Sequence, residues 1–506
     1  MEAIEVIADD EIEFSLLQDL PLAFVKGNMF LPLRREDGEL IAAVADNRGV
    51  FALRDLARSL DLKPRPVRAE EKTILDAINR VYSRTSRMTE VMGDIKGEDL
   101  SRVATEFESP QDLLELTEEA PIIRLLNALL MEAVKEKASD IHVEPYEKGL
   151  DVRLRVDGIL RKVLSPPKII QDALVSRIKI LAGLDIAEKR LPQDGRIRLL
   201  VGGKDIDIRV SIIPTSLGER AVLRLLDRQA GVLSLEMLGL SDSVLTSFKN
   251  ALSRPNGIIL VTGPTGSGKT TTLYASLLKL NTEERNIITV EDPVEYQLSG
   301  IGQMQVNPKI GLTFAAGLRS ILRQDPDIMM VGEIRDIETA EIAVHASLTG
   351  HLVLSTLHTN DAPSALTRLI DMGIEPFLVA SSLVCVLAQR LVRVICPLCK
   401  EPYTPSRQET DYLGITPAPP LLYRGKGCDK CLGKGYSGRT GIYEFLEITP
   451  DIRAMIVERK DAQVIRRTAA LKSGFTTLQK NAIDKIIKGV TTVEEVLRVT
   501  QKDAEE

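Results

Sequence analysis

The most constraining feature of the sequence is the stretch Gly-Pro-Thr-Gly-Ser-Gly-Lys-Thr at residues 263–270. It matches the pattern G-x-x-x-x-G-K-[ST], a loop whose backbone N–H groups surround a nucleotide phosphate. The flanks agree, because the apolar run 257–262 is typical of a buried strand and residues 271–280 are typical of a helix. The helix N-terminus adds partial positive charge at the same place. These residues therefore predict a phosphate-binding strand, loop and helix.

Each position of the loop has a predicted task. Glycine is needed at three positions because the backbone must turn its N–H groups inward without a clash of Cβ atoms. Lys269 is predicted to place its charge on the β- and γ-phosphates of ATP, and the Thr270 hydroxyl to bind Mg²⁺. The predicted nucleotide-binding residues are Gly263, Pro264, Thr265, Gly266, Ser267, Gly268, Lys269, Thr270 and Thr271.

Further apolar stretches alternate with helical patterns after the loop, at residues 286–290, 327–331 and 350–355. This α/β alternation predicts a parallel sheet covered by helices, whose ligands lie at the carboxyl ends of the strands. The polar residues at those ends are Glu291 and Asp292, then Glu333, then Thr356 to His358. A lone buried carboxylate at Glu333 would be costly, which favours a role beside Mg²⁺ and the attacking water.

Two of these residues have structural alternatives. Asp292 precedes a proline, so it could instead cap a helix. His358 could be a core histidine, although its place at a strand end beside the loop favours contact with phosphate. His142 and His345 fall outside this cluster and are interpreted as structural.

The segment before this core has the pattern of an α+β domain with an antiparallel sheet. A helix is predicted from Pro121, and hairpins join strands at 150–156 and 159–164 and at 196–201 and 204–213. Its polar face is rich in arginine, at Arg153, Arg155, Arg196, Arg209 and Arg224. These side chains form either a solvated face or a set that reaches a phosphate held by a neighbouring domain or subunit.

Four of the five cysteines form two C-x-x-C pairs, Cys396 with Cys399 and Cys428 with Cys431. Two such pairs predict a tetrahedral zinc site, although their separation exceeds the common spacing of about 15–20 residues. The segment contains no histidine, which favours a structural site. Cys385 lies in an apolar stretch that we expect to be a core helix.

Composition argues against several classes of protein. The net charge of −7 and the lack of tryptophan disfavour a nucleic-acid translocase, which needs a basic channel and stacking side chains. No uncharged apolar run reaches the roughly 18 residues of a membrane span, and the acidic N-terminus lacks the pattern of a signal peptide. We therefore expect a cytoplasmic chain that meets a membrane only through partners. An inactive scaffold is disfavoured because both Lys269 and Glu333 are present.

Four stretches resemble the sequence boxes of the secretion ATPase superfamily. They are residues 263–270 (Walker A), 289–296 (Asp box), 322–336 (Walker B) and 349–358 (His box). Residues 138–145 and 192–196 are similar to the second N-terminal domain of that superfamily, and the cysteine pairs favour its type II secretion branch. The type IV pilus assembly ATPases, which share every box, are the alternative.

The resemblance implies a RecA-like core and a Mg²⁺-dependent ATPase that works as a homo-hexamer, peripheral on the cytoplasmic face of the inner membrane. It implies two partners: a bitopic inner-membrane protein that anchors the first domain, and a polytopic platform protein through which a pseudopilus is assembled. It also implies that Glu333 activates water, that Glu291 and Glu295 support metal and water, that His358 lies near the γ-phosphate, and that Arg209 and Arg224 complete the site. Gly332 stands where many P-loop enzymes have aspartate, so either Glu333 or Glu291 could be the base.

Six parts are predicted along the chain. They are an N-terminal docking domain at 1–82, a linker at 83–115, the α+β domain at 116–232, the ATPase core at 233–390, a zinc-binding subdomain at 391–440 and a helical C-terminal domain at 441–506. The first domain carries no visible chemistry, which favours docking or regulation.

Overall fold

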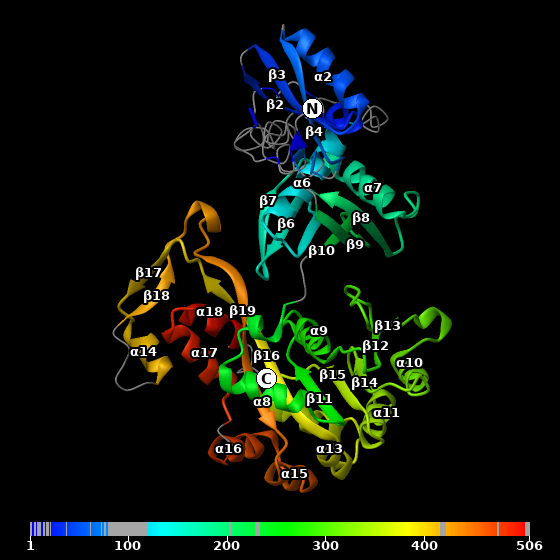
Figure 1. The fold of residues 1–506 in the computed structure, drawn as a ribbon. Coiled ribbons are helices and arrows are strands. Elements are labelled where there is room, and N and C mark those ends of the chain that lie inside the picture. The colour runs from blue at the N-terminus through cyan, green and yellow to red at the C-terminus, as the bar shows by residue number, and fades with distance from the viewer. Residues whose placement is uncertain are drawn as a thin grey trace. The chain divides into compact units, whose positions relative to one another are not determined.

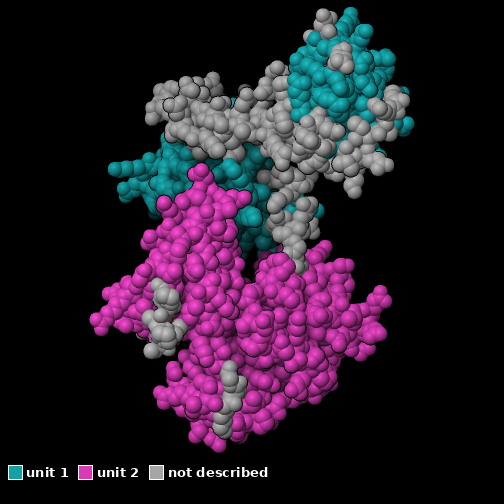
Figure 2. Space-filling model, turned by 60° about the vertical axis from the view of Figure 1, so that its left-hand side comes forward, with its two compact units in different colours: residues 1–229 teal, residues 230–506 magenta. Residues whose placement is uncertain are grey.

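The computed structural model describes residues 120–201, 204–227, 233–414, 421–472 and 475–500, and most residues between 3 and 78. The chain divides into two compact units, residues 1–229 and 230–506 (Figures 1 and 2). The predicted linker at 83–115 lies outside the described residues. Among the helices that are described, none has the length and apolar character needed to cross a membrane.

The first unit begins with a small mixed domain. Its sheet has the order β1-β4-β3-β2, built from β1 (Ala3–Ile4), β2 (Phe30–Glu36), β3 (Glu39–Val44) and β4 (Lys63–Ala69). Helix α2 (Asn47–Ser59) begins at Asp46, whose carboxylate accepts hydrogen bonds from the N–H groups of Arg48 and Gly49. Buried side chains of the strands and of α2, among them Phe30, Leu40 and Leu53, form its core.

The same unit continues with a second, six-stranded sheet of order β7-β6-β5-β10-β9-β8, in which all neighbours are antiparallel. Its strands are β5 (Asp140–Pro145), β6 (Leu150–Val156), β7 (Ile159–Leu164), β8 (Gln193–Val201), β9 (Lys204–Thr215) and β10 (Gly218–Asp227). Helices α6 (Ala120–Lys135) and α7 (Gln171–Ala182) supply the other apolar half of its core. The predicted α+β fold, its hairpins and the helix at Pro121 are confirmed.

The second unit is built on a seven-stranded sheet of order β13-β12-β14-β15-β11-β16-β19 (Figure 1). All its strands are parallel except β19, which runs antiparallel to β16. The strands are β11 (Gly257–Thr262), β12 (Ile287–Glu291), β13 (Gly302–Gln305), β14 (Ile328–Val331), β15 (Leu352–Leu357), β16 (Leu383–Ile395) and β19 (Tyr436–Glu447). Helices α8 (Asp242–Leu252), α9 (Lys269–Leu280), α10 (Phe314–Ile321), α11 (Ile337–Leu348), α12 (Ala362–Asp371) and α13 (Pro376–Ser382) lie between or before them. The predicted α/β core is confirmed.

One expected element is wrong. The apolar stretch around Cys385 is not a helix but strand β16, the longest of this sheet. Four of the 13 residues of β16 are valine, which favours strands, and the strand gains partners on both sides, β11 and β19. Cys385 itself is fully buried, as expected of a core residue.

The remaining elements follow β16. The cysteine-containing insert carries the ribbon of β17 (Lys400–Tyr403) and β18 (Leu422–Gly425) and helix α14 (Arg407–Leu413). After β19 the chain is helical, as predicted, in α15 (Pro450–Val457), α16 (Ala462–Lys472), α17 (Leu478–Ile487) and α18 (Val493–Thr500).

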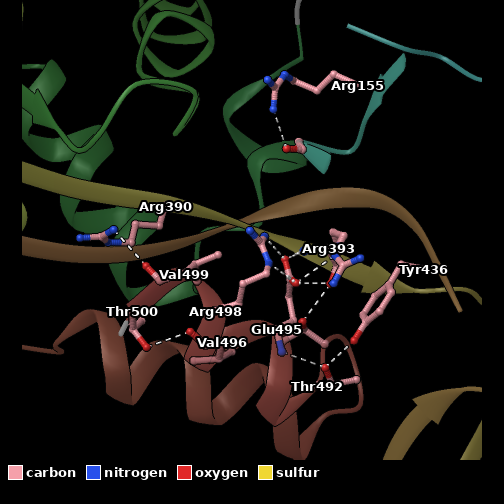
Figure 3. Close-up of polar contacts among 12 residues, drawn as sticks. Arg155, Arg390, Arg393, Tyr436, Thr492, Glu495, Val496, Arg498, Val499 and Thr500 are labelled. Atoms are coloured by element: carbon pink, nitrogen blue, oxygen red, sulfur yellow. Dashed lines mark hydrogen bonds and ion pairs between the residues drawn. The ribbon is translucent and has the colours of Figure 1, made fainter. Parts of the chain in front are cut away.

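Helix α18 is fastened to β16 by a buried carboxylate (Figure 3). Glu495 has no exposed surface, and its two oxygens accept hydrogen bonds from the guanidinium groups of Arg393 and Arg498. Tyr436 of β19 contacts the hydroxyl of Thr492 at 2.7 Å, and the guanidinium of Arg393 stacks on its ring. This cluster joins the last described helix to the strand beside the P-loop strand.

Candidate nucleotide-binding site

The P-loop leaves the sheet from its interior. Strand β11 lies between β15 and β16, and all six of its residues are buried. The chain turns at Gly263 (φ 146°) and enters α9 after Gly268 (φ 89°), which is the helix N-cap. A Cβ atom at Gly263 would lie 2.4 Å from the backbone oxygen of Gln389, so only glycine fits there. The predicted strand, loop and helix are therefore present, while nucleotide binding stays a prediction.

Lys269 lies folded over its own loop. Its Nζ donates hydrogen bonds to the backbone oxygens of Gly263 at 2.7 Å and of Pro264 at 3.2 Å. Burial lowers the pKa of this lysine to about 8, and the negative charge of Glu333 acts in the opposite direction. Neutral carbonyl groups thus provide its hydrogen bonds, and a phosphate would be a stronger partner because both groups are charged. Thr270 follows at the exposed first turn of α9.

Glu333 stands two residues beyond β14 and forms a cluster with two basic side chains. Its carboxylate lies 3.2 Å from Nε2 of His358 and pairs through its other oxygen with the guanidinium of Arg335. The Glu333 side chain is 14% exposed, so these partners meet it at the edge of the core. Sequence reasoning brought Glu333 and His358 to one edge of the sheet, but it missed Arg335. The available signal was a cation two residues after Glu333 in the Walker B box.

Hydroxyl groups tie the strand ends of this cluster together. Thr262, the last residue of β11, contacts the hydroxyl of Thr359 at 2.7 Å and the backbone oxygen of Leu357 at 3.1 Å. The hydroxyl of Thr356 donates to the backbone oxygen of Gly332 at 2.7 Å. These bonds fix the loop that carries His358 against the end of the P-loop strand and the segment that carries Glu333.

Glu291 ends β12 in a buried polar network. Its carboxylate accepts hydrogen bonds from the hydroxyl of Tyr274, from the hydroxyl of Thr289 at 2.5 Å and from the amide of Gln303 at 3.1 Å. Burial, together with the charge of Glu291, raises the pKa of Tyr274. Both oxygens of Glu291 are thus satisfied inside the protein. Sequence reasoning missed Tyr274 and Gln303, because neither belongs to a catalytic motif.

The rest of the Asp box continues from this network. The backbone N–H of Glu295 donates to the oxygen of Tyr274 at 3.2 Å. Asp292 is exposed, and no helix begins within residues 291–300, all of which are described. The helix-cap alternative for Asp292 is therefore wrong.

The candidate arginines Arg209 and Arg224 lie directly opposite each other on β9 and β10. Carboxylates of β5 hold several arginines of this face. Asp140 contacts Nε of Arg224 at 3.1 Å and Nε of Arg155 at 3.5 Å, and Glu144 pairs with Arg153 and Arg220. Both acids are buried whereas the arginines are half-exposed. Approach of Arg209 or Arg224 to a nucleotide stays a prediction.

The four cysteines of the two C-x-x-C pairs come together in the second unit. Their sulfur atoms all lie within 4.8 Å of one another, with Cys396 to Cys428 at 3.9 Å, Cys399 to Cys431 at 3.8 Å and Cys428 to Cys431 at 3.7 Å. Four sulfurs around zinc at about 2.3 Å would be separated by about 3.8 Å. Backbone N–H groups point at Cys399 and Cys431, which suits thiolates. The cluster can therefore hold zinc.

Comparison with known proteins agrees with this fold. The profile of the Type II/IV secretion system protein family matches residues 115–498. The chain belongs to that family. A second profile, that of the MshEN domain, matches residues 4–88. The secretion family match thus spans the α+β domain, the P-loop core, the cysteine cluster and the C-terminal helices, and the first domain has a match of its own.

Relatives within the secretion family include proteins of both branches. Type II secretion system protein E of Pseudomonas aeruginosa is 53% identical over 494 residues, which is 96% of each chain. Type II secretion system ATPase E of Vibrio cholerae is 54% identical over 429 residues, 84% of this chain and 85% of that one. Type IV pilus assembly ATPase PilB of Myxococcus xanthus is 44% identical over 507 residues, 98% of this chain and 88% of the other. These identities favour the type II secretion branch.

A solved structure shows the same fold. The crystal structure of the pilus retraction motor PilT with bound ADP is 28% identical and matches with a TM-score of 0.51, covering 75% of this chain and 98% of that chain. The pilus retraction motor and this chain therefore share a fold.

Proposed function

We propose that this chain hydrolyses ATP to power pseudopilus assembly and protein export by a type II secretion system. The observation that carries the proposal is the identity of 53–54% to relatives named Type II secretion system protein E or ATPase E. The P-loop with Lys269 and the adjoining cluster of Glu333 and His358 supply a site suited to that chemistry. Type IV pilus assembly is the second candidate, at the lower identity of 44%.

ATP is proposed to bind in the loop of residues 263–271, with its phosphates on the N–H groups of the residues after Pro264 and on the ammonium of Lys269. The loop fits such a group, because it joins a helix N-terminus to an ammonium that donates hydrogen bonds to two neutral carbonyl oxygens. Mg²⁺ would be held by the hydroxyl of Thr270 and, when bound, would neutralise charge on the β- and γ-phosphates.

Glu333 is proposed to orient the attacking water and to accept its proton. Glu291 is the weaker candidate for the base, because its carboxylate is already satisfied by Tyr274, Thr289 and Gln303. Glu291 and Glu295 would support the metal and water from the end of β12. His358, at 3.2 Å from Glu333, would approach the γ-phosphate, and Arg209 and Arg224 would add positive charge in the transition state.

Substitution of Glu333 tests this assignment. We expect Glu333→Gln to lower kcat for ATP hydrolysis by at least about a hundredfold, since a general base contributes about 10²–10⁴-fold, while ATP still binds. Steady-state kinetics and calorimetry with Mg·ADP would measure the two effects. Hydrolysis near the wild-type rate would exclude Glu333 as the base and move that role to Glu291.

The assembly proposed around this ATPase is a homo-hexamer, peripheral on the inner membrane. Its first domain would dock on the cytoplasmic domain of a bitopic secretion protein. ATP hydrolysis would drive pseudopilus assembly through the polytopic platform protein. The four cysteines would hold a structural zinc ion. The six-part division predicted from the sequence is retained as a proposal.

Capture by membrane anchors separates the two candidate functions. The full chain would be mixed with the immobilised cytoplasmic domain of the host's type II secretion anchor and, in parallel, with that of its pilus anchor. Selective retention by the secretion anchor is the expected result. Selective retention by the pilus anchor would assign the chain to the pilus branch.

A further inference from the structure

Gln389 of β16 lies directly beneath the P-loop, although it is 122 residues away in the chain from the loop residue it contacts. Its side chain is 1% exposed. The amide Nε2 donates a hydrogen bond to the backbone oxygen of Ser267 at 2.7 Å, and Oε1 accepts one from the hydroxyl of Thr272 at 2.7 Å. One buried side chain therefore joins the last turn of the loop to the first turn of α9.

Gln389 also approaches the loop closely at two of its glycines, once with a backbone atom and once with a side-chain atom. A Cβ atom on Gly263 would lie 2.4 Å from its backbone oxygen, and a Cβ atom on Gly268 would lie 3.2 Å from its Nε2. Gln389 thus packs against both ends of the loop, and we call it the floor of the loop. Larger residues at Gly263 or Gly268 would push the loop off this floor.

The bond to Ser267 determines the direction of a phosphate-binding group. A trans peptide is planar, and its C=O and N–H point in opposite directions. Because Gln389 holds the oxygen of Ser267, the N–H of Gly268 on the same peptide points away from Gln389 and into the loop. That N–H is among the donors expected to surround a phosphate in a P-loop.

The backbone oxygen of Ser267 determines which end of the Gln389 amide faces the loop, because a carbonyl oxygen can only accept and therefore requires the NH₂ group. The hydroxyl of Thr272 then donates to Oε1 at the other end of the amide. Thr272 is itself 1% exposed, and its backbone N–H donates to the oxygen of Gly268 at 3.1 Å. The reverse orientation of the amide would set Oε1 against the oxygen of Ser267, which is unfavourable.

We propose that Gln389 is a positioning residue for nucleotide binding, which holds the Ser267–Gly268 peptide with its N–H turned toward the phosphate. The inference rests on the proposed ATPase function. Without this bond the peptide would have to be ordered when the nucleotide arrives, so affinity falls for substrate and transition state alike. Loss of this hydrogen bond should therefore raise Kd and KM and leave kcat nearly unchanged.

Gln389→Met tests the inference in the full-length chain, because methionine keeps the length of the side chain and removes both hydrogen bonds. We expect the Kd for Mg·ADP, measured by calorimetry, to rise by roughly tenfold, in line with the loss of a buried hydrogen bond. KM for ATP should rise in parallel, with kcat within about twofold of wild type. An unchanged Kd, or a fall in kcat alone, would overturn the proposal.

Thr272 provides the matched pair of variants. Thr272→Ser keeps the hydroxyl and should bind Mg·ADP as wild type does, whereas Thr272→Val has the same shape without it and should bind several-fold more weakly. Combining Gln389→Met with Thr272→Val should add little to either single effect, because both act through one network. If Gln389→Met does not fold, equal Kd values for Thr272→Ser and Thr272→Val are sufficient to reject the proposal.

The proposed ATPase function and the proposed role of Gln389 can be rejected separately. If the wild-type chain binds no Mg·ADP, the proposed function is wrong. If the wild type binds it and the Gln389 and Thr272 variants bind equally well, only the role of Gln389 is wrong.

Discussion

Lys269 shows how one residue can link pH to the proposed activity. Burial lowers its pKa to about 8, so the free protein loses this proton as the pH rises through 8. A bound phosphate favours the charged form and would restore the proton. The proposed nucleotide binding would therefore be coupled to proton uptake above pH 8.

We accordingly expect the Kd for Mg·ADP to be nearly constant below pH 7, to have risen about twofold at pH 8, and to approach a rise of about tenfold per pH unit above that. Calorimetry in buffers of different ionisation enthalpy would also count the proton taken up. Lys269→Gln is the control, since it should bind weakly without this slope. A wild-type Kd that does not change between pH 8 and 9.5 would contradict the assignment.

At the scale of elements, β16 is the strand on which several parts of the second unit meet. Gln389 contacts the P-loop, Arg393 holds α18 through Glu495, and Cys396 follows directly after the strand. Arg393 and Arg498 lower the pKa of Glu495, against the opposing effect of burial. The stability that Glu495 adds is therefore present above about pH 4.5, the ordinary pKa of glutamate, and is lost as the pH falls through the lowered value.

Removal of this carboxylate should loosen the attachment of α18. We expect Glu495→Ala to lower the free energy of unfolding of the second unit by about 3 kcal/mol, because it leaves Arg393 without its buried partner. Urea denaturation followed by circular dichroism would measure it. Glu494→Ala, one residue earlier on the exposed side of the same helix, should change stability by less than about 0.5 kcal/mol. Equal effects of the two variants would contradict the view that Glu495 attaches α18 to β16.

The sequence predicted those elements whose signals are local. The P-loop has a fixed spacing, the hairpin around Asp157 has alternating apolar residues and a turn pair, and the C-x-x-C pairs carry their own ligand types. Strand β16 was mistaken for a helix because its apolar first half, residues 383–388, is too short a run to show a period that separates the two structures. The stretch is a strand because it pairs with β11 and β19, and these partners are distant in the sequence.

Buried polar residues were missed for a related reason. Gln389 and Tyr274 acquire their roles from contacts across the fold, to Ser267 and to Glu291 respectively. Nothing in their immediate neighbours marks them. Glu333 and His358 could be found because strand ends in a parallel sheet share one edge, whereas a side chain in the middle of an apolar strand looks like any other core position.

At the scale of the whole molecule, the proposed function gives a role to one arginine that lies outside the unit with the P-loop. Arg224 belongs to the first unit and Lys269 to the second, so hydrolysis would depend on an arginine supplied from outside the P-loop core. We expect Arg224→Ala to lower kcat by at least about tenfold while Mg·ADP affinity is largely kept, since such arginines act mainly on the transition state.

Arg198→Ala is the matched control for this prediction. Arg198 is a similarly exposed arginine of the same sheet, paired with Asp205, and its loss should leave kcat within about twofold of wild type. The oligomeric state of both variants should be compared by light scattering, so that a change in assembly is separated from a change in catalysis. Equal kcat values for the two variants would remove Arg224 from the site.

The long separation between the P-loop and its floor also affects biosynthesis. A ribosome completes the motif at residues 263–270 well before it reaches Gln389, which is 122 residues beyond Ser267. Until then, Gln389 is not there to hold the oxygen of Ser267 or the hydroxyl of Thr272, and strand β11 lacks its neighbour β16. If the chain binds nucleotide as proposed, the growing polypeptide should therefore acquire that affinity late, once β15 and β16 have emerged and docked.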